Sequence, residues 1–149
     1  MSRKLVLDDI ADLRAYERER PGFRDRVIEL KRRRRVPLGT VLTVLFETRD
    51  TIRFQIQEMA RVERMLSDEQ IAHEVETYNE LIPDAGELSA SMFIELTTEA
   101  DLREWLPKLV GIQDYVAFWI PTSFGSHSRK SATEARRDPG LRRVLVARW

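Results

Sequence analysis

The sequence contains no cysteine, only two histidines and no apolar run long enough to cross a membrane. The absence of cysteine excludes disulfide bonds, thiolate zinc sites, iron–sulfur ligation and a cysteine nucleophile. The six glycines are all isolated, so no phosphate-binding glycine loop is present and no cofactor is expected. Asp8, Asp9 and Asp12 occupy positions where a signal peptide needs apolar residues. We therefore expect a soluble, cytoplasmic protein without membrane contact.

Charge is present in quantity but unevenly placed along the chain. The formal net charge is zero, with 25 basic and 25 acidic residues in 149. Residues 1–36 carry 12 basic and 7 acidic side chains, residues 37–120 carry 6 and 16, and residues 121–149 carry 7 and 2. Such asymmetry indicates a basic face that meets an anionic partner or the acidic middle of the same chain.

Apolar periodicity predicts one α+β domain over residues 1–120, with an antiparallel sheet of about four strands and helices packed on one side. The composition of residues 121–149 instead predicts a poorly ordered basic tail. The first expected elements are a helix capped by Asp8 or Asp9 and interrupted at Pro21-Gly22, and a helix from Phe23 into the basic run. A hairpin of strands 41–46 and 52–56, which turns at 48–50, follows. The remaining elements are a helix from Met59, a helix from Ser67 to Leu81, a strand over 90–96, a helix from Thr98 to Gly111 and a strand over 115–120.

The run Lys31, Arg32, Arg33, Arg34 and Arg35 stands at the end of the second predicted helix. Five adjacent cations suit multivalent phosphate, which favours RNA or DNA as a ligand, or an acidic protein surface. Cations at a helix C-terminus also complement the helix dipole while remaining in water. No stacking aromatic residue or nucleic-acid motif accompanies the run, so the pattern leaves these interpretations open.

The acidic middle contains a histidine at helical spacing from carboxylates. Glu69, His73 and Glu76 would share one helix face and form a weak candidate metal site, whereas a solvated acidic face explains the same spacing. The Glu-x-x-His pattern of di-iron bundles is not met, because Gln70 stands three residues before His73. The serines lie in no Gly-x-Ser-x-Gly frame, so no catalytic residue is assigned.

Five segments resemble an uncharacterised bacterial family of unknown function. They are Leu7 to Ile10, Tyr16 to Pro21, Lys31 to Val36, Arg53 to Arg64, and Tyr78 to Pro83 continuing through Gly86 to Ala90. Genes of that family commonly stand beside those for rubrerythrin-like proteins and iron–sulfur oxidoreductases. The resemblance, which covers about residues 3–120 and stops before the last 29, implies an accessory role in redox or peroxide metabolism.

The resemblance also draws attention to polar residues that a core does not require. These residues, which with the basic run form the predicted interaction patch, are Gln55, Gln57, Glu58, Arg61, Glu63, Tyr78, Asn79 and Glu80. On the predicted strand, Gln55 and Gln57 share one face, and Glu58 and Arg61 are spaced to pair. Alternatively, Arg61 and Glu63 only fasten a helix to the basic segment.

The leading hypothesis is therefore a non-catalytic interaction protein linked to redox or oxidative-stress metabolism. It would dock on a protein partner, such as a rubrerythrin-like protein or an iron–sulfur oxidoreductase, through the basic run and the Gln57 to Glu63 face. The alternatives are a nucleic-acid-binding accessory that uses the basic run and a carboxylate-histidine metal-binding protein.

Overall fold

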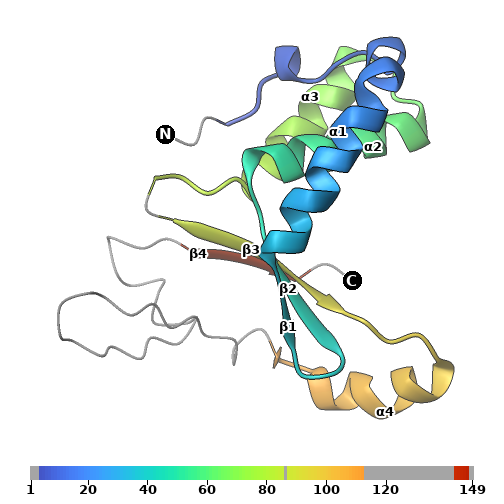
Figure 1. The fold of residues 1–149 in the computed structure, drawn as a ribbon, viewed down its shortest axis with the longest axis vertical. Helices are drawn as coiled ribbons and strands as arrows, with labels where there is room; N and C mark the ends of the chain where they lie inside the picture. The colour runs from blue at the N-terminus through green and yellow to red at the C-terminus, as the bar shows by residue number, and fades with distance from the viewer. Residues whose placement is uncertain (1–3, 86, 113–142, 148–149) are drawn as a thin grey trace.

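The computed structural model describes residues 4–85, 87–112 and 143–147, the last for the backbone only. Helices α1, α2 and α3 gather at one end of a sheet, and α4 lies toward the opposite end (Figure 1). The elements in chain order are η1 (Leu7–Asp9), α1 (Leu13–Arg34), β1 (Arg35–Leu38), β2 (Leu42–Phe46), α2 (Arg49–Glu63), α3 (Asp68–Asn79), β3 (Leu88–Ile94), α4 (Glu99–Leu109) and β4 (Arg143–Ala147).

The first long helix, α1, is continuous, so the predicted interruption at Pro21-Gly22 is wrong. Its N-cap is Asp12, whose carboxylate accepts a hydrogen bond from the Ala15 amide, and not Asp8 or Asp9. Pro21 removes one hydrogen bond within the helix. Buried residues nevertheless lie on both sides of it in the chain, because the helix packs along its length on α2; they are Tyr16, Phe23 and Val27.

Residues 52–56 are helical, so the predicted second strand of a hairpin turning at 48–50 is also wrong. Thr48 caps α2 by accepting a hydrogen bond from the Thr51 amide. Ile52, Ile56 and Ala60 recur every four residues and are all buried on one face of the helix. The observed hairpin instead joins β1 to β2 through Gly39, which has a φ of 67°.

The sheet has four strands in the order β1-β2-β3-β4. Strands β1, β2 and β3 are antiparallel, with Val44 of β2 opposite both Val36 and Met92. Strand β4 pairs with β3 in parallel. The α+β class is thus confirmed, but the antiparallel part has three strands, the fourth is parallel, and the helices gather toward the two ends. The strand predicted over 115–120 lies outside the described residues. Of the predicted tail, 121–149, the structure describes only 143–147, and these residues form β4.

Local capping signals outside the first two helices agree with the structure. Ser67 caps α3 through the Gln70 amide, and Thr98 caps α4 through the Asp101 amide. Strand β3 overlaps the predicted 90–96 strand, and Gly111 follows α4 with a φ of 78°. These boundaries depend on contacts within a few residues, which explains why the sequence predicts them.

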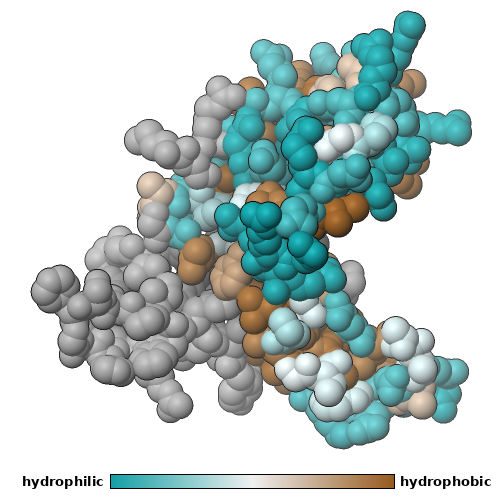
Figure 2. Space-filling view, viewed as in Figure 1, coloured by the Kyte–Doolittle hydropathy of each residue, from teal (hydrophilic) through white to brown (hydrophobic). Residues whose placement is uncertain are grey.

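The helical end and the sheet are each stabilised by their own clusters of buried apolar side chains. The helical end is built around Ile52, Ile56 and Ile82, and a second cluster of Tyr16, Phe23 and Val27 fills the α1–α2 contact. A third cluster lies in the sheet, where Val44 and Met92 pack together with Ala90. In Figure 2, hydrophilic residues cover most of the visible helical end, and apolar residues gather where the sheet approaches α4.

Candidate functional site

The basic run does not form one patch in the folded chain. Arg32 and Arg33 are exposed in the last turn of α1, and both pair with Glu29 one turn earlier on the same helix. Hydrogen bonds from Arg33 and Arg32 hold the pKa of the Glu29 carboxyl below its usual value. Arg34 is exposed beside them. These three arginines are the part of the run that is exposed on the last turn of α1.

The two ends of the run point elsewhere. Arg35 begins β1, where its guanidinium lies 3.8 Å from Glu95 and 5.7 Å from the centroid of the Phe93 ring. Lys31 is half-buried, and its ammonium lies 5.5 Å from the centroid of the Phe54 ring. The five cations therefore occupy three environments, namely solvent, the sheet surface and the junction between helices and sheet.

Glu58, from the family-like segment 53–64, links α2 to α1. It receives a bidentate ion pair from Arg20, with distances of 2.7 and 2.9 Å, and a hydrogen bond of 2.7 Å from the Tyr16 hydroxyl. The Arg20 hydrogen bonds hold the pKa of Glu58 below its usual value. Burial and the bond to Glu58 raise the pKa of Tyr16. Glu58 is thus part of a helix–helix contact.

Two further ion pairs continue this contact along the antiparallel helices. Arg61 pairs with Glu17 at 2.5 Å, and Arg53 pairs with Glu19 at 2.7 Å. The Arg53 guanidinium also lies 4.7 Å from the centroid of the Phe23 ring. Arg61 is therefore engaged within the fold, and the predicted pairing of Glu58 with Arg61 is replaced by pairs with α1.

Gln57 and Asn79 hold the N-terminal segment by backbone hydrogen bonds. The buried Gln57 amide accepts from the Ala11 amide at 2.8 Å and donates to the Ala11 carbonyl at 3.1 Å. Asn79 does the same with the amide and carbonyl of Leu5, both at 2.8 Å. The predicted face shared by Gln55 and Gln57 does not exist, because successive odd positions of a helix point in different directions.

The remaining polar candidates on α2 and α3 are solvent-exposed or line a cavity. Glu63 and Glu80 are exposed, whereas Tyr78 is buried and Gln55 is half-buried beside it on the cavity wall. The weak metal candidates are also exposed on α3: Glu69, His73 and Glu76. In the described part of the chain, no group of three or more histidine or carboxylate side chains is arranged to hold a metal ion.

A cavity of about 110 Å³, with a mostly apolar wall and a few polar groups, lies where α1, α2 and α3 meet the sheet. Its centre is Glu47, a buried carboxylate between β2 and α2. One carboxylate oxygen accepts a hydrogen bond of 2.6 Å from Thr51, and the other accepts one of 2.5 Å from Ser91 on β3. The lining is completed by Lys31, Gln55 and Tyr78 together with apolar residues.

Lys31 and Glu47 bring opposite charges to this cavity. Burial lowers the pKa of Lys31, while the Glu47 carboxylate opposes that change and Arg35 reinforces it. Of the predicted patch, only Lys31, Gln55 and Tyr78 come together here. The sequence analysis missed Glu47 and its two hydroxyl partners. A carboxylate directly after a buried apolar strand was the available signal.

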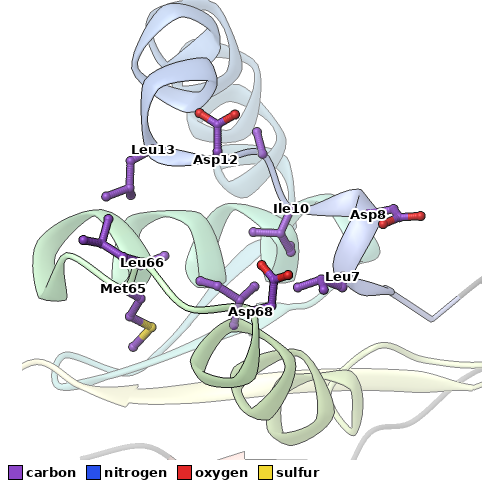
Figure 3. Close-up of a pocket in the computed structure, with 11 residues that line it drawn as sticks. Leu7, Asp8, Ile10, Asp12, Leu13, Met65, Leu66 and Asp68 are labelled. Carbon is purple, nitrogen blue, oxygen red and sulfur yellow. The ribbon is translucent and has the colours of Figure 1, made fainter.

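A second hollow, which we call the Leu66 groove, has a volume of about 280 Å³ and lies between η1, the start of α1 and the α2–α3 connection (Figure 3). Figure 3 shows Leu13 and Leu66 on one side of it and Leu7 on the other. Leu66 is 83% exposed. The lining is apolar apart from three aspartates, and it contains no cation: Leu7, Asp8, Ile10, Ala11, Asp12, Leu13, Ala60, Met65, Leu66, Asp68 and Ile71.

No helix in the described residues is long and apolar enough to pass through a bilayer. The comparison with curated proteins found no match. One solved structure, described as a novel protein of unknown function from Burkholderia pseudomallei, is 40% identical with a TM-score of 0.69. The alignment covers 74% of this chain and 62% of that chain, so this chain spans less than two thirds of that protein.

The family model described as "Protein of unknown function (DUF3501)" matches residues 4–139. This match includes the segments that carry the sequence resemblance and extends beyond residue 120. Because the model covers most of the 149 residues, the chain belongs to the DUF3501 family of proteins of unknown function.

Proposed function

We propose that this protein is a non-catalytic interaction module that docks on a partner protein through the Leu66 groove. The observation that carries the proposal is the 83% exposure of Leu66 at a hollow lined by both apolar side chains and aspartates. A large apolar side chain held in water at the rim of a hollow, with polar groups around it, is typical of a contact surface. Val62, four residues earlier near the end of α2, is also exposed.

The charge around the groove indicates the charge of the partner segment that would bind there. Asp8, Asp12 and Asp68 line it without any lysine or arginine. An apolar segment that carries basic side chains would bury its apolar residues against Leu13 and Leu66 and place its cations beside the aspartates. We therefore assign an apolar, basic protein segment as the occupant.

This groove replaces the predicted Gln57 to Glu63 face as the docking surface. Gln57, Glu58 and Arg61 are engaged within the fold. The partner class follows from the family resemblance, which points to a rubrerythrin-like protein or an iron–sulfur oxidoreductase. A role in redox or oxidative-stress metabolism follows from that partner and is part of the same proposal.

The test is a calorimetric titration of the purified protein with each of these two partners from the source organism. Leu66→Asp places a carboxylate in the apolar contact and is expected to weaken binding at least about tenfold, a loss of about 1.4 kcal/mol. Val110→Asp is the matched control, because Val110 is 82% exposed at the other end of the fold. Absence of binding by both partners, or equal effects of the two variants, would overturn the proposal.

A second candidate function, nucleic-acid binding, rests on the exposure of Arg32, Arg33 and Arg34 at the end of α1. Each phosphate contact contributes about 0.9 to the slope of log affinity against log salt for duplex DNA. Fluorescence anisotropy with labelled RNA and DNA should show this slope and its loss when the three arginines become alanine.

The matched control changes three other exposed arginines of the same helix to alanine: Arg14, Arg18 and Arg24. Both triple variants lower the net charge equally, so a difference between them measures position and not total charge. Equal loss in both variants, or no binding at low salt, would contradict a nucleic-acid site at the helix end.

A further inference from the structure

The cavity around Glu47 is lined by Lys31, a half-buried lysine. We propose that Lys31 is a covalent capture site for small aldehydes or ketones, which enter this cavity and form an imine with the Lys31 amine. The site is separate from the Leu66 groove, since the two linings have no residue in common. The inference therefore stands or falls independently of the docking proposal.

The described lysines differ in how their amines are engaged. Lys108 pairs with Glu104 at 2.8 Å, and Lys4 donates to the Asn79 and Ile82 carbonyls. The Lys31 amine takes part in none of the hydrogen bonds or ion pairs found among the described residues and instead lies over the Phe54 ring. An amine without a hydrogen-bond acceptor has its lone pair free for attack once it loses its proton.

Burial makes that proton easier to lose. Desolvation lowers the pKa of Lys31, and the positive charge of Arg35 acts in the same direction. The opposing influence is Glu47. Tyr78 is the ionisable group that α3 contributes to the cavity wall. The neutral amine, which is the nucleophile, is therefore more available at Lys31 than at an exposed lysine.

The cavity limits the ligand by size and by polarity. Its volume of about 110 Å³ is smaller than the ~150 Å³ cavity that accommodates benzene, so only a few non-hydrogen atoms fit. Hydroxyl and amide groups from Thr51, Gln55 and Ser91 line it. A short carbonyl compound with a hydroxyl group would place its carbonyl carbon at Lys31 and its hydroxyl against these polar groups.

The reaction needs no oxidant or reductant. The lone pair of the neutral Lys31 nitrogen attacks the carbonyl carbon, and the carbonyl oxygen takes up a proton to give a carbinolamine. Loss of water then leaves the imine, so that both amine protons depart with the former carbonyl oxygen. Glu47 is the carboxylate in the cavity that can pass a proton from nitrogen to oxygen.

The test uses the full wild-type protein, glycolaldehyde as the probe and cyanoborohydride to reduce any imine to a stable amine. Peptide mass spectrometry then compares the rates at Lys31, Lys4 and Lys108 within the same molecule. We expect Lys31 to react fastest of the three at pH 7, because its lowered pKa leaves a larger fraction of its amine unprotonated. Equal rates at the three lysines would overturn the proposal.

Two controls separate the cavity from simple surface reactivity. Pyridoxal is too large for the cavity, so the preference for Lys31 should disappear with it, and an unchanged preference would exclude capture inside the cavity. Lys31→Arg keeps the charge and should abolish labelling at this position. Lys108→Arg is its matched control and should leave the Lys31 rate unchanged.

Glu47→Gln tests the proton transfer assigned to Glu47. Removal of the carboxylate charge lowers the pKa of Lys31 further and by itself would increase the labelling rate. Loss of a proton relay would decrease the rate. We expect a net decrease of about tenfold, because the loss of general acid–base catalysis, typically about 100-fold or more, is partly offset by the larger fraction of free amine. An increase would remove Glu47 from the reaction step.

Discussion

The helical end of the molecule, formed by α1, α2 and α3, and the separate helix α4 are stabilised by different kinds of contact. Around α2, Ile56 is completely buried and Gln57 is hydrogen-bonded to the η1–α1 connection. In α4, Leu109 is the buried residue, and Leu106 on the preceding turn is 42% exposed. Among the residues that the structure describes, one end is therefore fixed by contacts between elements, whereas the polar contacts of α4 lie mainly within the helix itself.

The ion pairs show the same difference. Arg20 with Glu58 and Arg61 with Glu17 join residues about forty positions apart in the chain. In α4, Arg103 pairs with Glu99 and Lys108 with Glu104, each four residues away on the same helix. Pairs of the first kind hold two helices together, and pairs of the second kind support a single helix by only a few tenths of a kcal/mol.

The largest expected effect comes from the core of the helical end. Ile56→Ala leaves a cavity beneath α2 and is expected to lower the free energy of unfolding by about 2–5 kcal/mol. Leu106→Ala on α4 removes a partly exposed side chain and should cost less than about 1 kcal/mol. Urea denaturation followed by circular dichroism measures both. Similar losses in the two variants would show that α4 is as firmly packed as α2.

Breaking the Glu58 contact should have the next largest effect. Glu58→Ala removes the acceptor for the buried Tyr16 hydroxyl and the partner of Arg20, for an expected loss of about 1–3 kcal/mol. Adding Tyr16→Phe should recover part of this loss, because the unsatisfied hydroxyl is gone. Glu104→Ala in α4 is the control and should change stability by no more than about 0.5 kcal/mol. No recovery in the double variant would argue against the buried hydroxyl as the cause.

The pH dependence of the same contact follows from the lowered pKa of Glu58. Its ordinary value is 4.5, and the folded value is lower, so its stabilising contribution is present above the unfolded pKa and is lost as the pH falls through the folded pKa. The stability difference between the wild type and Glu58→Gln should therefore be constant at neutral pH and shrink below about pH 4.5. Denaturation midpoints at several acidic pH values measure this; a difference independent of pH would contradict the assignment.

The smallest effects concern the partly exposed ion pairs. A double-mutant cycle on Glu17 and Arg61 should give a coupling energy of about 0.2–1 kcal/mol that decreases with added salt. The corresponding cycle on Glu99 and Arg103 should give no more than about 0.5 kcal/mol. A larger coupling in α4 than between α1 and α2 would reverse the comparison.

The two wrong secondary-structure predictions have a common physical origin. Ile52, Phe54 and Ile56 fit a period of two, but Ile52 and Ile56 also fit a helical spacing of four, so the sequence pattern does not distinguish a strand from a helix there. Pro21 weakens a helix locally, but burial of Tyr16 and Phe23 across the α1–α2 contact compensates for the missing hydrogen bond. In both places the outcome depends on residues far away in the chain.

The candidate sites were predictable only in part. Resemblance to family segments drew attention to Lys31, Gln55 and Tyr78, which do share a cavity. It could not separate them from Gln57 and Asn79, which fasten the N-terminal segment. A polar side chain within a family-like segment gives the same signal whether it faces a cavity or a neighbouring backbone.

The α+β class, the caps of α3 and α4, and the lack of thiol chemistry can be predicted from the sequence, because they depend on composition and on residues a few positions apart. Tertiary structure alone decided that 49–63 is helical, that Glu58 is paired across two helices, and that Glu47 is buried beside Lys31. Those outcomes depend on which distant side chains compete for burial and for hydrogen bonds, and only the packed chain brings them together.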